Sequence, residues 1–411
     1  MNAQRLLERF VRYVKVDTTA CEGAAAYPSS PGQLELGKLL AGELRELGLR
    51  DVTQSPQGIV TATIPATVPR AAPAIAFFAH LDTSPETTGK GVQPQVIRDY
   101  DGRDLVLPAD RSRQITVAEN PELAELRGKI LITTDGTTLL GADNKAGIAA
   151  IMSAAEFLMA HPDTPRGDVR ICFTCDEEIG HGVDHVDLAA LGAVVGYTLD
   201  GYASNQIDVE TFSADLATIT VRGKNIHPSI GKGRMINAVR VAAAFVDRLP
   251  RETLSPESSD GRQGFLHPYH VDGGVAEVSL RVLLRDFDTP QLAVQADLLR
   301  RTAAEVEARF PGSAIDLSIR PQYRNMADGL AQDPRAVAYA EQALRNLGRQ
   351  PHLTIIRGGT DGSRLTELGL PTPNLSTGEH NPHSPLEWTC LEEIVEAAEW
   401  IVALCQVWAK G

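Results

Sequence analysis

The sequence has few of the features that mark nucleic-acid-binding, membrane or fibrous proteins. Its 411 residues include 53 acidic and 39 basic side chains, for a formal net charge of −14, and no run of Lys or Arg stands out. This acidic balance argues against nucleic acid or an anionic membrane as a partner. No apolar run approaches the roughly 20 residues that a membrane-spanning helix needs. The sequence also has no internal repeat and no low-complexity tract.

Cysteine is scarce as well, with five residues in the chain. A sparse, odd-numbered set suits a reducing compartment better than a disulfide framework, so we expect a cytoplasmic protein. Cys172 and Cys175 lie three positions apart in a segment that we expect to be a strand. They would then face opposite sides and pack instead of chelating one ion. The amphipathic, charged start MNAQRLLERFVRYV is not expected to be a signal peptide.

The chain is too long for one compact core, so about two domains are expected. Helix and strand patterns first alternate, which predicts an α/β main domain whose mixed, largely parallel sheet is flanked by helices. The pattern then changes to that of a smaller, ferredoxin-like α+β domain before the first pattern returns. We therefore predict a main domain in two parts, 1–210 and 324–411, with a second domain inserted at 211–323.

Histidines and carboxylates gather where the predicted strands end. In an α/β sheet, sites form at the carboxyl ends of the strands. Two histidines and three carboxylates, one of them shared, are the inventory of a two-metal hydrolytic site. The side chains in question are His80, Asp82, Asp143, Glu177, Glu178, Asp200, His380 and His383.

Taken singly, these positions have simpler explanations. Asp143 could cap the helix that begins at NKAG, and Asp200 before a glycine is typical of a turn. His80 and Asp82 would point to the same side of an extended chain. That arrangement suits a general base, a metal ligand backed by a carboxylate, or a hydrogen-bonded histidine beside a capping aspartate. The full set, at successive strand ends, favours metal binding.

Glu177 and Glu178 are the most informative pair. By themselves two adjacent glutamates are more often a solvated loop pair. If their side chains point apart, however, one can bind a metal while the other holds a water molecule. A two-metal hydrolase needs that division of labour.

Together the motifs resemble the M20 family of metallopeptidases. HLDTSP, GADNKAG, DEEIG, RGGTDG and NLSTGEHNPHSPLEW occur in the family's order and span nearly the full chain. The resemblance implies a cytoplasmic exopeptidase that removes the amino-terminal residue from tripeptides. The attacking water would bridge two zinc ions, for which cobalt or manganese could substitute. The alternatives are the family's dipeptidases, carboxypeptidases and N-acyl-amino-acid deacylases, or an inactive peptide-binding relative.

The resemblance also implies which residues would hold the metals. His380 stands where the family has a non-ligand, and the register of NPHSPLEW favours His383 instead. Asp82 would orient the ring of His80. Glu177 would be the general base that takes a proton from the bridging water. The implied ligands are His80 and Asp200 for one ion, Glu178 and His383 for the other, and Asp143 between both.

Three further expectations follow from the resemblance. The inserted domain would be a lid whose His227 stabilises the oxyanion, and such domains also pair in some family members, so a homodimer is possible. Arg285 and Arg357 would hold the substrate carboxylate, although Arg285 could equally pair with the aspartates that follow it. Asn381 would contact the peptide's amino end. Asn144 departs from the family, which has a second aspartate there and a cis peptide bond before it.

Overall fold

The computed structural model describes residues 1–68 and 72–411, and this chain divides into two compact units. The first unit comprises Met1–Val209, Asp328–Thr354 and Thr360–Gly411, and the second comprises Glu210–Ala327 and Ile355–Gly359. No feature of the sequence predicts that the short segment Ile355–Gly359 belongs to the second unit.

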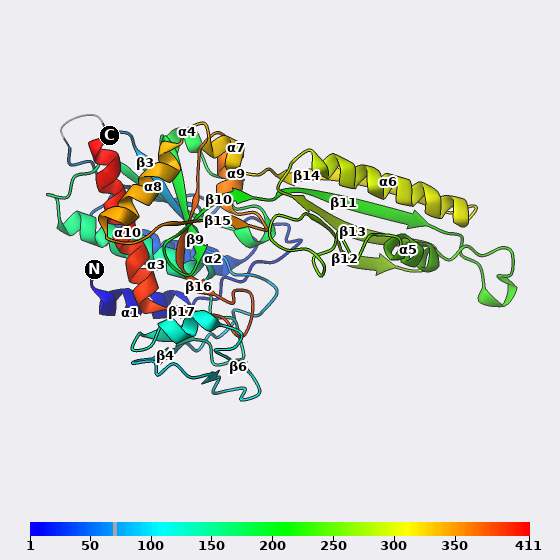
Figure 1. The fold of residues 1–411 in the computed structure, drawn as a ribbon, viewed down its shortest axis with the longest axis horizontal. Helices are drawn as coiled ribbons and strands as arrows, with labels where there is room; N and C mark the ends of the chain where they lie inside the picture. The colour runs from blue at the N-terminus through cyan, green and yellow to red at the C-terminus, as the bar shows by residue number, and fades with distance from the viewer. Residues whose placement is uncertain (69–71) are drawn as a thin grey trace. The chain divides into compact units, whose positions relative to one another are not determined.

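An 11-stranded mixed sheet is the centre of the first unit (Figure 1). In sheet order, nine of its strands are β1 (Arg50–Gln54), β2 (Val60–Ile64), β8 (Val169–Thr174), β3 (Ile75–His80), β9 (Val195–Tyr202), β16 (Asn374–His380), β17 (Trp388–Cys390), β7 (Leu131–Thr133) and β4 (Gln95–Ile97). The other two are β10 (Gln206–Thr211), which pairs with β16, and β15 (His352–Ile356), which pairs with β10.

The parallel pairs lie together in the middle of this sheet. β3 is parallel to β8 and β9, and β9 is parallel to β16. Antiparallel pairs join β2 to β8 and β16 to β17. The predicted mixed α/β sheet is therefore confirmed, with its parallel part confined to four central strands. These strands bring their carboxyl ends to one edge, which is where a site is expected in such a sheet.

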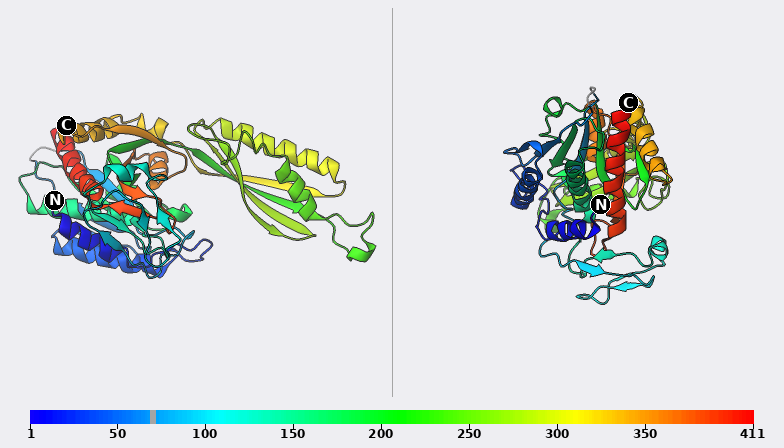
Figure 2. Two further views of the ribbon diagram at one scale, coloured as in Figure 1. Left: turned by 60° about the horizontal axis from the view of Figure 1, so that its bottom comes forward. Right: turned by 90° about the vertical axis from the view of Figure 1, so that its left-hand side faces the viewer.

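Helices cover both faces because the central strands are apolar on both sides. Phe77 of β3 packs into one core with α3 and α10, whereas the next residue, Phe78, packs into a second core with α4 and α9. Figure 2 shows α10 beside α8 on the first face. The helices are α1 (Ala3–Tyr13), α2 (Pro31–Glu46), α3 (Ala142–Ala160), α4 (Leu188–Leu191), α7 (Ala327–Leu330), α8 (Arg335–Asn346), α9 (Asp361–Glu367) and α10 (Leu391–Lys410).

Cys172 in β8 and Cys175 just after its end face opposite sides, as predicted. Cys172 belongs to the second of these cores and Cys175 to the first, and both thiols are free and buried. Among the described residues, no helix is long and apolar enough to cross a membrane. The remaining short elements are β5 (Leu105–Val106), β6 (Gln114–Ile115), η1 (Pro121–Glu125) and η2 (Glu177–Ile179).

The second unit has a four-stranded antiparallel sheet with its own apolar core. The order β-α-β-β-α-β is that of a ferredoxin-like domain. Its edge strand β12 is interrupted at Pro268 by a register shift, which suits an edge position because proline is tolerated there. The elements are β11 (Ser213–Arg222), η3 (Pro228–Ile230), α5 (Ala238–Asp247), β12 (Phe265–Gly273), β13 (Glu277–Asp286), α6 (Gln291–Arg309) and β14 (Ala314–Tyr323).

Candidate metal centre

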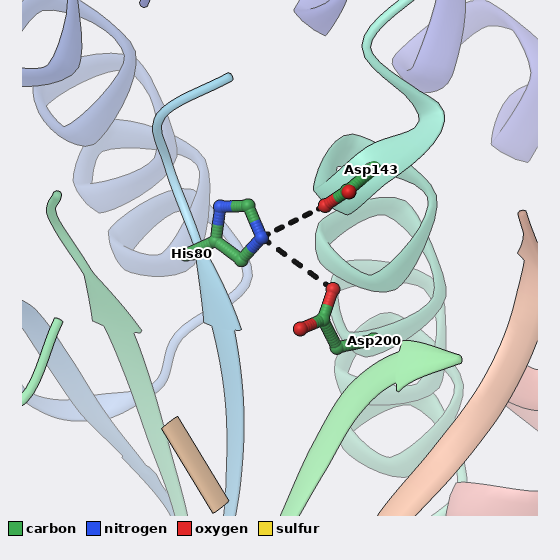
Figure 3. A group of neighbouring side chains, drawn as sticks. All are labelled: His80, Asp143 and Asp200. Atoms are coloured by element: carbon green, nitrogen blue, oxygen red, sulfur yellow. Dashed lines mark hydrogen bonds and ion pairs between the residues drawn. The ribbon is translucent and has the colours of Figure 1, made fainter. Parts of the chain in front are cut away.

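The register of two parallel strands brings the first group of side chains together. Phe78 of β3 is paired with Thr198 of β9, so His80 and Asp200, each two residues further on, end up side by side. Nε2 of His80 lies 3.4 Å from Oδ1 of Asp200 and 2.9 Å from Oδ1 of Asp143 (Figure 3). One nitrogen and two carboxylate oxygens thus converge in a place where each is close enough to share a cation.

A second group forms around the other oxygen of the same aspartate. Oδ2 of Asp143 lies 3.1 Å from Nε2 of His383, and this nitrogen is 2.9 Å from Oε2 of Glu178. Asp143 therefore offers one oxygen to each group, which is the geometry that a bridging ligand requires. Capping of a helix does not explain the side chain of Asp143, because its two oxygens face the two histidines instead of backbone N–H groups of α3.

Glu177 and Glu178 do separate toward the two groups. Both lie on η2, which follows β8. Oε2 of Glu177 is 3.9 Å from Nε2 of His80, whereas Glu178 contacts His383. The carboxylate of Asp82 holds this short helix, because its two oxygens accept the backbone N–H groups of Glu177 and Glu178 at 3.1 Å and 3.0 Å.

Asp82 also contacts the ring of His80, but chiefly through its main chain. Nδ1 of His80 donates to the carbonyl oxygen of Asp82 at 3.1 Å, and the carboxylate oxygen lies further away, at 3.4 Å. Donation from Nδ1 leaves Nε2 of the neutral ring free to bind a metal. Asp82 thus supports both the first histidine and the two glutamates.

The site crowds carboxylates in a setting with little water. Burial raises the pKa of Glu178 to about 8, and the charge of Asp143 adds to this effect. Burial likewise raises the pKa of Asp200 to about 6 and that of Glu177 well above its usual value. Burial alone would lower the pKa of His383, but Asp143 and Glu178 raise it to about 12. Negative charge in this site therefore needs a cation as a partner.

The donor set fits a divalent transition metal. Nitrogen and carboxylate oxygen are the ligands that zinc, cobalt and manganese accept. Oε1 of Glu178 is buried and has no hydrogen-bond partner among residues 1–68 and 72–411, which suits an atom whose partner is an ion. The peptide bond between Asp143 and Asn144 is cis, as the family resemblance implied.

His380 is placed away from these groups by its packing. Its ring stacks on Trp388 with 3.7 Å between ring centroids, and its Nε2 lies 2.8 Å from Oε2 of Glu393. Asn381, the next residue, donates its amide to Oδ1 of Asn120 at 2.8 Å. The proposed contact of Asn381 with a peptide stays a prediction.

The other three predicted residues lie in the second unit. His227 is exposed at the start of η3, where its Nδ1 lies 2.7 Å from the hydroxyl of Ser229. Arg285 donates to Gln322 at 2.8 Å and lies over the ring of Tyr323. The guanidinium of Arg357 donates to the carbonyl oxygens of residues 259, 261 and 263, so it holds a loop. The roles of these three in substrate binding stay predictions.

Sequence reasoning missed several buried carboxylates around the site. Asp361, at the start of α9, accepts a hydrogen bond from Thr174 at 2.7 Å, and Glu379 accepts one from Thr377 at 2.7 Å. Glu387 accepts backbone hydrogen bonds in the loop that carries Asp143. All three stand in the motifs RGGTDG and NLSTGEHNPHSPLEW, which are the available signal. A carboxylate whose partners are backbone groups from another segment leaves no spacing to recognise.

An α/β sheet that gathers these nitrogen and carboxylate donors at its strand ends defines a metal-dependent hydrolase. The sequence model of peptidase family M20/M25/M40 matches residues 134–407. The chain belongs to this family of peptidases, and the predicted family is confirmed.

Relatives with full-length similarity agree with this assignment. The chain is 43% identical over 407 residues to a peptidase T of Geobacillus kaustophilus (strain HTA426), with 99% of each chain covered. It is 42% identical over 406 residues to a peptidase T of Bacillus licheniformis, again with 99% of each covered. The aminopeptidase PepT of Bacillus cereus ATCC 10987 has a similar structure, with a TM-score of 0.76 at 24% identity over 100% of this chain and 99% of that one.

Proposed function

We propose that this chain is an aminopeptidase that releases the amino-terminal residue from tripeptides with the help of two zinc ions. The observation that carries the proposal is the position of Asp143, whose two oxygens each lie against a different histidine. The motif resemblance implies tripeptides as substrates, and the relatives named peptidase T support it. Cobalt or manganese could replace zinc in the same donor set.

Five side chains would hold the two ions. His80 and Asp200 form one set, Glu178 and His383 form the other, and Asp143 belongs to both. When bound, the ions supply charge that polarises the scissile carbonyl and lowers the pKa of a water molecule. The chain's own part is to keep these donors in place and to exclude bulk water.

Glu177 would carry the proton. Its carboxylate lies beside the first group but belongs to neither of the two ligand groups found among the described residues. Burial raises the pKa of Glu177 well above its usual value, and the negative charge of Asp200 adds to the effect. A carboxylate with a raised pKa can take a proton from the attacking water at Oε2 and then hand it to the leaving amine.

The second unit would serve as a lid. Its exposed His227 would stabilise the oxyanion, and Arg285 and Arg357 would receive the substrate carboxylate. Because Arg357 already donates to loop carbonyl oxygens, its substrate role needs that loop to move. The scarcity of cysteine supports a cytoplasmic location. The family resemblance also makes a homodimer possible, and sedimentation would show whether the chain forms one.

One assay tests the substrate class. Free amino acid released from Met-Gly-Gly is measured with and without chelator, beside the same peptide N-acetylated and the dipeptide Met-Gly. The proposal expects cleavage of the free tripeptide alone, loss of cleavage with chelator, and its return with zinc or cobalt. Cleavage of the acetylated peptide would instead indicate a deacylase or carboxypeptidase, and cleavage confined to dipeptides would indicate a dipeptidase.

The Glu177→Gln variant tests the proton carrier. We expect kcat to fall by about 100- to 10,000-fold, because a general base is lost, while metal content stays unchanged. Metal content is measured by atomic emission after dialysis. Turnover near the wild-type rate with full metal content would exclude this role for Glu177.

A further inference from the structure

Glu387 is a buried carboxylate that joins two loops of the candidate metal centre. Its side chain accepts three backbone hydrogen bonds from one short segment, from Leu140 at 2.6 Å, Gly141 at 2.8 Å and Asp143 at 3.1 Å. It is 1% exposed and follows His383 by four residues in the chain. One carboxylate therefore ties the loop of the second histidine to the backbone beneath the shared aspartate.

The segment that Glu387 holds has little support of its own. The first N–H groups of a helix have no acceptor within the helix. The N-cap of α3 is Gly141, with φ of +81°, and it provides no side-chain cap. The backbone of Asp143 is itself non-helical, with ψ of 104°. Glu387 supplies the missing acceptors from a distant segment, and its negative charge suits a helix N-terminus.

Each oxygen of Glu387 has a separate task. Oε2 accepts from Leu140 and Gly141, and Oε1 accepts from the N–H of Asp143. This backbone lies at the base of the side chain that reaches both histidines. A shift of the segment would therefore move both oxygens of Asp143 relative to His80 and His383.

The loop of His383 has a second tie that does not involve Glu387. The hydroxyl of Thr87 donates to the carbonyl oxygen of His383 at 2.6 Å. Loss of Glu387 would thus leave His383 held by Thr87, whereas Leu140, Gly141 and Asp143 would lose a shared acceptor.

We propose that Glu387 is a positioning residue that fixes Asp143 between the two histidines and so sets metal affinity at both groups. The inference rests on the proposed role of Asp143 as the shared ligand. Asp143 reaches both groups because Glu387, in the loop of His383, holds the backbone of Asp143 in place. Outer partners of this kind typically change metal affinity by about 10- to 100-fold.

The test compares the full-length variants Glu387→Gln and Glu387→Asp with a matched control. Both oxygens of Glu387 are acceptors, so the amide NH₂ of glutamine must face at least one backbone N–H. The control is Glu392→Gln, because Glu392 also accepts a backbone N–H, from Ile130 at 3.0 Å, in a segment without predicted ligands. The dissociation constant for Zn²⁺ is measured by competition with a chromophoric chelator. The visible spectrum of the Co²⁺-loaded protein reports ligand geometry.

We expect Glu387→Gln to weaken Zn²⁺ binding by about 10- to 100-fold and to alter the Co²⁺ spectrum. Glu387→Asp keeps the charge but reaches less far, so it should lie between Gln and wild type. The control should bind Zn²⁺ as wild type does. Thermal unfolding of the metal-free proteins shows that each variant is folded, and Glu387→Asp decides the matter if the Gln variant is not.

Two results would overturn the inference in different ways. If wild type binds two equivalents of Zn²⁺ and both Glu387 variants keep its dissociation constant and Co²⁺ spectrum, Glu387 is only a structural anchor and the proposed function stands. If wild type binds no Zn²⁺ or Co²⁺, the proposed metal site fails and this inference fails with it.

Discussion

The two histidine groups that share Asp143 are built in different ways. His80 ends a central strand, and its side chain is 2% exposed. His383 lies in the loop after β16, with a side chain that is 36% exposed and a backbone φ of +62°. Sheet register alone places the first histidine opposite Asp200, whereas the second depends on hydrogen bonds from other segments.

This difference indicates how the two groups should respond to change. A strand end between two parallel neighbours cannot shift without breaking ladder hydrogen bonds, so the first group is rigid before any metal binds. A loop has fewer such bonds and opens more readily. We therefore expect the His80 group to contribute more to stability and the His383 group to exchange its metal faster.

The largest effect should come from the residue that both groups share. Asp143→Ala removes one oxygen from each group, so we expect it to lose tight binding of both ions and all measurable turnover. The loss of affinity should exceed the roughly 10- to 100-fold that follows removal of an outer partner. Metal content after dialysis measures the loss of binding, and cleavage of Met-Gly-Gly measures the loss of turnover. One tight equivalent remaining in Asp143→Ala would show that the groups do not depend on a common ligand.

Removing each histidine in turn compares the two groups directly. In metal-free protein, His80→Ala leaves the largely buried carboxylate of Asp200 without the ring nitrogen that lies 3.4 Å from it, whereas Asp143 keeps His383. Removing one partner of such a pair costs about 3 to 5 kcal/mol. His383→Ala should cost less than His80→Ala, because the side chain of His383 is 36% exposed and solvent screens part of its attraction to Asp143 and Glu178.

Urea unfolding in the presence of chelator measures both values. His181→Ala is the control, because His181 pairs with Asp184 at 2.7 Å on the surface and should change stability little. Equal losses for the His80 and His383 variants would mean that strand and loop positions are equally rigid.

The same contrast explains what could be predicted from sequence. The ligands at strand ends, His80 and Asp200, follow from the apolar strand patterns before them and from the topology of parallel sheets. His383 could be distinguished from His380 only by motif register, because both stand in a turn-rich segment. The stacking of His380 on Trp388 depends on tertiary packing, which no local pattern encodes.

Carboxylates that act through backbone groups were the least predictable. Glu387 accepts hydrogen bonds from a segment that lies 244 to 247 residues away in the chain. Asp82 was predicted to orient a ring, and the structure adds its two bonds to η2. Hydrogen bonds to the main chain do not depend on the type of the donor residue, so they leave no sequence signal.

Asp82 should give an intermediate effect. Because the carbonyl oxygen of residue 82 still accepts from His80 when the side chain is changed, Asp82→Ala should chiefly loosen Glu177 and Glu178. We expect kcat to fall by about 10- to 100-fold at saturating metal, in the range of outer-partner losses. Steady-state kinetics with Zn²⁺ in excess would measure it. An effect confined to KM would contradict this explanation.

The smallest effect should come from Glu86, which lies against Nδ1 of His383 as Asp82 lies against Nδ1 of His80. Oε2 of Glu86 lies 3.4 Å from Nδ1 of His383, but the side chain of Glu86 is 72% exposed. An exposed pair contributes about 0 to 1 kcal/mol, so Glu86→Gln should weaken Zn²⁺ binding by no more than about 5-fold. The dissociation constant at low and at high salt measures this effect, which salt should remove. A loss as large as that of Asp82→Ala, unchanged by salt, would mean that the loop closes over Glu86 once metal is bound, so that both histidine groups become equally enclosed.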